Sequence, residues 1–170
     1  MAKDIQQLAT DLQRHQRELA SYIGSKAPRI VGKMGVEHFK ENFNQQGFVN
    51  NGVQPWPERK TDTGRRMLTG ETRELENSIE YESRGNKVSW GSDVPYAQIH
   101  NRGGKTKPHE IRVRRAKALK FAGKGGDVFR RKVNHPGSNI PKRQFIGHSQ
   151  EFIDKIDDRI ERDITNILNS

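Results

Sequence analysis

The chain contains no cysteine among its 170 residues. Disulfide bonds and thiolate zinc sites are therefore excluded as means of stabilising the fold. Apolar residues are also scarce, at 31% of the sequence, and the mean hydropathy is −1.00. Counting the 16 glycines brings the chain to about 40%, against roughly 45–50% in soluble domains counted in the same way. We therefore expect a thin hydrophobic core, either surrounded by long solvated loops or completed by apolar surface from neighbouring subunits.

Long apolar runs are missing as well. The longest run is far shorter than the roughly 20 apolar residues that a membrane-spanning helix requires. The first residues lead directly into a polar, helix-like pattern without the apolar core of a signal peptide. We expect no contact with a membrane, and a protein that is made and used in a cytoplasm.

The signatures of metal, nucleotide and catalytic sites are weak. Three histidines could in principle share a metal ion with an aspartate: His100, His109 and His135. They lie far apart in the sequence, whereas metal-binding histidines usually come at short spacings such as His-x-x-x-His. The segment 123–126 contains Gly-Lys but lacks the Ser or Thr that must follow in a phosphate-binding loop. We expect no metal ion, no cofactor and no enzymatic activity.

Positive charge is present in excess, and it is concentrated. The formal net charge is +10, and residues 102–132 contain twelve Lys and Arg side chains against only Glu110 and Asp127. This stretch alone equals the whole excess, while the last part of the sequence leans acidic. A polarised charge of this kind favours contact with a polyanion or with an acidic partner surface.

Helical periodicity marks both ends of the chain. Apolar residues recur every three or four positions in residues 1–44, with Gly24 as a stop and Pro28 in the first turn of a second helix. We predict that residues 1–44 form an antiparallel helical hairpin. A second amphipathic pattern follows Ser149, a good N-cap residue, and predicts a C-terminal helix over 148–170.

The middle of the chain combines a loop with short strands. Residues 45–64 are rich in Asn, Gln, Gly and Pro, which predicts a long loop held in place by Trp56. In residues 65–147, alternating residues around a Gly-Asn pair predict a β-hairpin, and further alternation lies within the basic loop 102–132. The whole chain, 1–170, is predicted to be one α+β domain, with a small antiparallel β-sheet packed with the helical hairpin and the C-terminal amphipathic helix.

Four short motifs follow the Pro-Trp loop. They are Leu-Thr-Gly at 68–70 leading to Ser-Ile, Tyr-Ala-x-Ile-His-x-x-Gly-Gly at 96–104, His-Pro-Gly at 135–137, and Pro-x-Arg-x-Phe-x-Gly at 141–147. Their order resembles the phage virion morphogenesis family, the tail-completion and head–tail joining proteins of tailed bacteriophages, over about residues 39–164. Gln144 stands where the family usually has proline. The residues expected to form the structural motif are Trp56, Tyr96, His100, Gly103, Gly104, Pro136, Gly137, Arg143 and Phe145.

His100 allows two interpretations. It follows Tyr96 and Ile99 and precedes a Gly-Gly turn, so it could act as a general base, with Ser92 as the nearest candidate nucleophile in the sequence. It could equally be a hydrogen-bonded histidine that holds the turn. We favour the structural interpretation, because no nucleophile is placed beside it by a recognised motif.

The basic stretch is the better candidate for a functional surface. Alternation would place Arg112 and Arg114 on one face, which could neutralise phosphates without reading sequence, or could simply be solvated. Phe121 and Phe129 are the only aromatic residues within it, so base stacking is poorly supported. The candidate partner or DNA contacts are Arg112, Arg114, Arg115, Lys117, Lys120, Arg130, Arg131 and Lys132.

The resemblance implies a structural virion assembly protein for tail completion or head–tail joining. It implies an oligomeric ring at the end of the phage tail, in the neck of the virion, after synthesis in the host cytoplasm. The expected partners are tail tube and connector proteins and further copies of the chain, with non-specific contact to genomic DNA. One alternative is a sequence-independent DNA-binding protein, and another is a phage hydrolase that uses His100.

Overall fold

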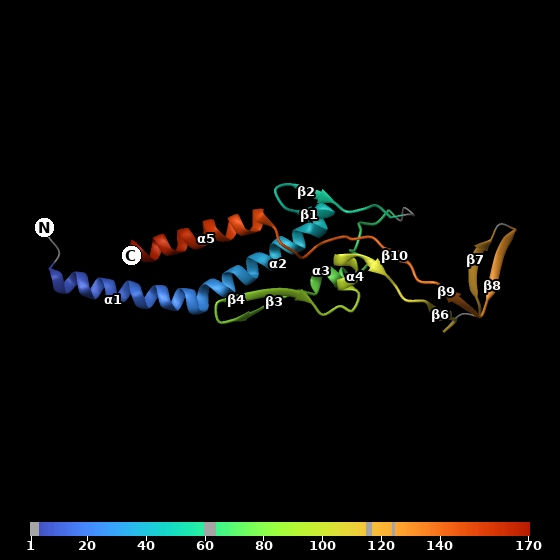
Figure 1. Cartoon of the computed structure of the whole chain (residues 1–170), viewed down its shortest axis with the longest axis horizontal. Coiled ribbons are helices and arrows are strands. Elements are labelled where there is room, and N and C mark those ends of the chain that lie inside the picture. Colours follow the sequence, from blue (N-terminus) through green and yellow to red (C-terminus); the bar gives the residue numbers. More distant parts are fainter. Residues whose placement is uncertain (1–3, 60–63, 115–116, 124) are drawn as a thin grey trace.

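The computed structural model describes residues 4–59, 64–114, 117–123 and 125–170. Figure 1 shows an elongated molecule with helices at one end, short strands and loops in the middle, and two β-ribbons at the other end. Both termini lie at the helical end. The α+β class predicted from the sequence is confirmed.

The first helical region is one continuous helix. α1 (Ile5–Ser21), the π-helical turn η1 (Tyr22–Lys26) and α2 (Ala27–Gln45) follow one another with helical dihedral angles at both junctions. Figure 1 shows the resulting long rod. The predicted stop at Gly24 is therefore wrong, and so is the predicted antiparallel hairpin.

The π-helical turn explains why the helix does not break. Here the Ala27 N–H bonds the Tyr22 carbonyl, five residues back, which makes a wider turn than in an α-helix. Pro28 lacks an N–H, and its ring would clash with the carbonyl four residues earlier in a regular helix. The wider turn just before Pro28 relieves this conflict, so the chain continues as a helix.

α5 (Gln150–Leu168) is the predicted C-terminal helix and runs antiparallel to the long helix (Figure 1). Ser149 caps it, since its hydroxyl accepts the Phe152 N–H at 3.2 Å. Further along, the Tyr22 hydroxyl donates to the Asp163 carboxylate at 2.9 Å. Burial, together with this hydrogen bond, raises the pKa of Tyr22 to about 12. These contacts fix α5 against the long helix.

Within the described residues, the strands form five separate two-stranded antiparallel sheets in place of one small sheet. The pairs are β1 (Gly47–Val49) with β2 (Val53–Pro55), β3 (Ile79–Arg84) with β4 (Lys87–Ser92), β5 (Gly104–Lys105) with β10 (Asn139–Ile140), β6 (His109–Arg112) with β9 (Lys132–His135), and β7 (Leu119–Gly123) with β8 (Gly126–Arg130). The hairpin predicted around the Gly-Asn pair is β3–β4 and is confirmed.

The segment predicted as a loop over 45–64 contains the β1–β2 ribbon. Asn51 and Gly52 lie between the two strands with φ of 51° and 115°. An Asn-Gly pair with positive φ at both residues is a strong hairpin signal, which the loop-like composition concealed. The tryptophan behaves as predicted, because Trp56 is buried directly after β2.

Two glycines on α2 let the β3–β4 ribbon pack close to the helix. A Cβ atom at Gly32 would come within 2.1 Å of the Tyr81 ring, and one at Gly35 within 2.1 Å of the Trp90 indole. The Trp90 indole N–H also donates to the Gly32 carbonyl at 2.9 Å. The aromatic side chains therefore occupy the space that larger helical residues would need.

The core is a cluster of aromatic rings between α2, α5 and the following loops. Phe43 packs against Trp56 and Phe145, with ring centroids 5.4 and 5.3 Å apart, and Phe39 packs against Phe152 at 5.6 Å. Edge-on and tilted arrangements at these distances are favourable for aromatic pairs. Beyond the core, the apolar stripe at the start of α1 is exposed, as the low apolar content leads one to expect.

Candidate partner interface

Two of the motifs meet in one place, which we call the motif clamp: α4 (Ala97–Arg102) together with residues 141–147. The third, with Pro136 and Gly137, lies outside it, where Gly137 packs against Thr106. The Asn101 side chain accepts the N–H groups of Phe145 and Ile146 at 2.7 and 3.0 Å and donates to the Ile146 carbonyl at 2.9 Å. The Arg143 N–H bonds the His100 carbonyl at 2.8 Å. α4 and the 141–147 segment are thus joined by four hydrogen bonds.

Arg143 and Trp56 extend the clamp to the loop after β2. The buried Arg143 guanidinium donates to the carbonyls of Pro57 and Glu58 at 2.9 and 3.1 Å. The Trp56 indole N–H donates to the Gln144 carbonyl at 2.7 Å. A buried guanidinium that binds backbone carbonyls serves the fold, so Arg143 is not available to a partner.

Glycines in the motifs allow the close approach of neighbouring backbones. Gly103 has φ of 73°, and a Cβ there would lie 2.9 Å from the Lys142 nitrogen. At Gly137, with φ of 86°, a Cβ would lie 2.0 Å from the Thr106 carbonyl oxygen. Gly104 continues into β5, and Pro136 is exposed directly before Gly137. The positive φ values at Gly103, Gly104 and Gly137 are adopted without strain only by glycine.

Tyr96 and His100 lie on one side of α4. Their rings meet edge to face, 5.9 Å apart, and the Tyr96 hydroxyl donates to the Glu74 carboxylate of α3 (Glu74–Asn77). This hydrogen bond raises the pKa of Tyr96. Burial, followed by the nearby Arg143 charge, lowers the pKa of His100.

Ser92, the nucleophile considered for His100, is engaged elsewhere. Its hydroxyl lies 2.7 Å from the Ser78 hydroxyl and accepts the Val94 N–H at 3.2 Å. The described residues therefore do not join Ser92 to His100 as a catalytic pair. The predicted hydrogen bond from the His100 ring to the turn is not found either, because its buried Nδ1 atom has no partner among the described residues; the backbone carbonyl of His100, which accepts the Arg143 N–H, makes the link instead.

Two asparagines, the buried Asn42 and the half-buried Asn101, are structural residues that sequence reasoning missed. Asn42 is fully buried on α2, donates to the Phe145 carbonyl at 2.9 Å and accepts the Val49 N–H at 2.8 Å. Asn101 was quoted in a motif but was given no role. One feature of the sequence could have identified them: each asparagine lies beside apolar residues of a helix. An amide group that is removed from water at such a position needs a hydrogen-bond partner.

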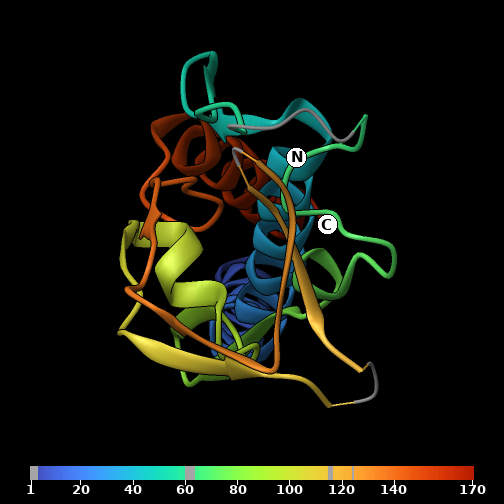
Figure 2. The same ribbon diagram turned by 90° about the vertical axis from the view of Figure 1, so that its right-hand side faces the viewer.

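The second part of the candidate interface is the basic arm, residues 106–138, which holds the β6–β9 and β7–β8 ribbons. Figure 1 shows that these ribbons stand away from the helices, and in Figure 2 this end of the molecule faces the viewer. The short β5–β10 pair closes the base of the arm. The arm therefore presents its charge at one end of the elongated molecule.

Part of the predicted basic set is neutralised within the arm. Glu110 pairs with Arg112 and with Lys132, the latter at 3.2 Å, and Lys120 pairs with Asp127 at 2.7 Å. These hydrogen bonds, first that from Arg112, lower the pKa of Glu110. Two carboxylates therefore compensate two of the three positive charges of Arg112, Lys120 and Lys132.

The remaining cations of the predicted set are open to solvent. No acidic partner is found for them among the described residues, and all are exposed: Arg114, Lys117, Arg130 and Arg131. Arg115 lies outside the described residues. The arm thus retains positive charge that its own carboxylates do not neutralise.

Each ribbon of the arm has an apolar side. In β6–β9 the paired residues Ile111 and Val133 share a face with His109 and His135, whose rings stack 5.1 Å apart. In β7–β8 the paired residues Phe121 and Val128 share one face, and Phe129 on the opposite face is 57% exposed. The arm therefore offers apolar contact as well as charge.

The helices of the described chain include none that is both long and apolar enough to cross a membrane. Over the same residues, no group of three or more His, Cys, Asp or Glu side chains is placed to hold a metal ion. The rings of His109 and His135 do stack, but neither His100 nor an aspartate, the other members of the set considered from the sequence, joins them in such a group within the described residues.

Comparison with known proteins gives one match. The model of the phage virion morphogenesis family matches residues 3–165. No curated protein and no solved structure matches the chain. The match confirms the resemblance seen in the motifs and extends it to the long N-terminal helix.

Proposed function

This chain belongs to the phage virion morphogenesis family, and from that premise we propose that it completes the tail or joins it to the head. Membership gives the chain a structural role in the assembly of a phage virion. We propose further that it acts as an oligomeric ring at the end of the tail, in the neck of the virion. Its partners in this proposal are tail tube and connector proteins.

The observation that carries this proposal is the contrast between the clamped body and the projecting basic arm (Figure 1). The side chains of Arg143, Asn101 and Trp56 all donate hydrogen bonds to backbone carbonyls, so they hold the loops of the body in a fixed arrangement. A rigid body with a projecting arm suits contact between neighbouring copies and with a tail tube. A head-to-tail contact of this kind closes a ring when the rotation between copies permits it.

Light scattering on the purified chain tests the proposal, first alone and then with isolated tail tubes of the same phage. We expect a defined oligomer to form, either in solution or on the tube ends, where electron microscopy would show a terminal ring. A chain that stays monomeric and never joins the tubes would refute the ring.

A second function, sequence-independent DNA binding, is supported by the four exposed arm cations Arg114, Lys117, Arg130 and Arg131. Neutralising several phosphates would make binding fall steeply with salt. Retention on a DNA column at about 0.1–0.2 M salt, with little dependence on base sequence, is the expected result for this function. Elution at low salt would contradict the DNA-binding function, and the assembly role would then be the one function proposed.

A further inference from the structure

A groove of about 470 Å³ lies where α2, the turn between β1 and β2, and the start of α5 come together. Ligand-sized clefts commonly measure about 300–1,000 Å³. Apolar side chains contribute much of its surface: Met34, Val49, Val53 and Phe152. Val53 is 45% exposed. Val53 and the half-buried Met34 are therefore open to an incoming group, whereas Val49 and Phe152 are buried beneath them.

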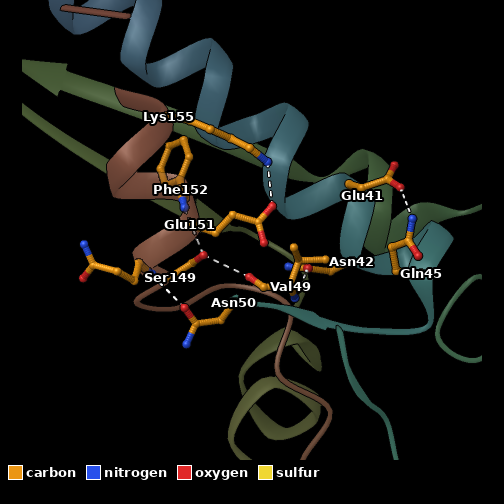
Figure 3. A network of polar contacts seen from close by, with 10 residues as sticks. Glu41, Asn42, Gln45, Val49, Asn50, Ser149, Glu151, Phe152 and Lys155 are labelled. Atoms are coloured by element: carbon orange, nitrogen blue, oxygen red, sulfur yellow. Dashed lines mark hydrogen bonds and ion pairs between the residues drawn. The ribbon is translucent and has the colours of Figure 1, made fainter. Parts of the chain in front are cut away.

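Three glutamates border the apolar surface, and we call the whole feature the acidic groove. They are Glu37, Glu41 and Glu151. Figure 3 shows Glu41 beside Gln45, and Glu151 reaching Lys155. Hydrogen bonds from Asn44 and Gln45 lower the pKa of Glu41, and Lys155 lowers that of Glu151. Lys155 is the one lysine lining this groove, so the carboxylates are in excess.

A buried histidine in the same groove has an unused hydrogen-bonding atom. His38 is only 8% exposed, and its ring stacks on Phe152 with centroids 4.9 Å apart. Its Nε2 atom is buried without a hydrogen-bond partner among the described residues. A buried polar atom of this kind normally finds a partner, and an incoming donor at the groove would provide one.

The β7–β8 ribbon has the complementary character. Cross-strand pairing puts Phe121 and Val128 on one face, with Leu119 and Arg130 as the next pair on that face. Phe121 is 39% exposed, and no third strand joins the ribbon within the described chain. An isolated two-stranded ribbon is only marginally stable in water, so an apolar face of this kind calls for a covering surface.

We propose that the acidic groove of one copy receives the β7–β8 ribbon of a neighbouring copy. Phe121 and its apolar neighbours would cover the groove surface, while Arg130 would meet the glutamates. The groove lies in the middle of the molecule and the ribbon at its end, so the ribbon stands away from its own groove (Figure 1). The contact is therefore between molecules, and it joins two different surfaces.

This inference rests on the proposed self-assembly and adds the surfaces that mediate it. A heterologous contact of groove and ribbon leaves one copy with a free ribbon and the other with a free groove, so further copies can add until a ring closes. Phosphate binding would account for the arm cations, but not for a face on which an exposed Phe121 lies beside the half-buried Val128.

Because the chain has no cysteine, single introduced cysteines can test the contact directly. Glu37→Cys and Arg130→Cys variants are prepared separately, mixed, and oxidised, both alone and on tail tubes. The mixture is expected to form a disulfide-linked dimer, whereas each variant alone is not, because the two surfaces differ. Glu18→Cys, at an exposed position on α1, replaces Glu37→Cys in the control mixture and is expected to give no dimer.

Charge reversal gives an independent readout by sedimentation equilibrium of the full chain. Glu37→Lys and Arg130→Glu are each expected to weaken association about tenfold, and the double variant is expected to recover most of it. Glu18→Lys is the matched control and is expected to leave association unchanged.

The outcomes separate the two proposals. If the chain assembles but the mixed cysteines never link and charge reversal has no effect, the groove contact is overturned and the ring stands. If no assembly occurs alone or on tubes, both fall. If Arg130→Glu weakens only DNA retention, the ribbon is a DNA contact and the groove proposal is likewise overturned.

Discussion

The body and the basic arm of this protein use their polar residues in opposite ways. In the body, the half-buried amide of Asn101 and the buried guanidinium of Arg143 make hydrogen bonds to the backbone. In the arm, cations such as Arg114 and Arg131 are exposed and lack acidic partners among the described residues. The family motifs thus fix the geometry of the body, and the charge is left for partners.

The comparison predicts that equal substitutions will have very unequal effects on stability. Phe43→Ala removes a fully buried ring that packs against Trp56 and Phe145. We expect the free energy of unfolding to fall by about 3–5 kcal/mol. Phe129→Ala in the arm removes an exposed ring and should change it by about 0.5 kcal/mol or less. Urea denaturation followed by tryptophan fluorescence measures both, and equal losses would remove the distinction between body and arm.

The hydrogen bonds of the motif clamp should give the next largest effect. Asn101→Ala leaves the N–H groups of Phe145 and Ile146 without their acceptor, which we expect to cost about 2–3 kcal/mol of unfolding free energy. Gln98→Ala lies on the same short helix at an exposed position and is the matched control. If both variants unfold at the same urea concentration, Asn101 is not the link between α4 and the 141–147 segment.

The junction between body and arm depends on backbone space at Gly103. Gly103→Ala introduces both a positive-φ strain and a contact with the Lys142 backbone, with an expected loss of about 2 kcal/mol. Gly85, at the β3–β4 turn, also has positive φ but open space around it. Gly85→Ala should therefore cost only about 1 kcal/mol, from strain alone. Thermal unfolding of the pair separates the two contributions, and equal costs would argue against crowding at Gly103.

Helix ends and turns that are determined by a few adjacent residues could be predicted from the sequence. The Ser149 cap, the Gly-Asn hairpin and the glycine after α4 were all identified from short segments and are present. The continuity of the N-terminal helix was not, because a π-helical turn lets Pro28 follow Gly24 without a break. The rule that glycine followed by proline ends a helix failed here because the π-helical turn, an uncommon geometry, accommodates the proline.

Long-range contacts account for most of what the sequence did not reveal. Asn42 bonds Phe145, 103 positions away in the chain, and no spacing rule connects the two. The same holds for the groove, whose glutamates come from α2 and α5, and for the ion pair of Glu110 with Lys132 across a ribbon. The basic arm was predicted from composition, but the partial neutralisation of its charge required the pairing register.

The last prediction concerns the effect of pH on the free energy of unfolding. Histidines of the body should contribute to it, and a histidine of the arm should not. Burial lowers the pKa of both His38 and His100 in the folded chain, below the value of about 6.5 for an unfolded histidine. Below that pH the unfolded state binds protons that the folded state does not, so the free energy of unfolding should fall as pH decreases from 7 towards 5. The slope is at most about 1.4 kcal/mol per pH unit for each histidine. His38→Gln and His100→Gln should each flatten this dependence in urea titrations, with His109→Gln in the arm as the matched substitution. An equal flattening by His109→Gln would mean that burial in the body does not govern the acid response.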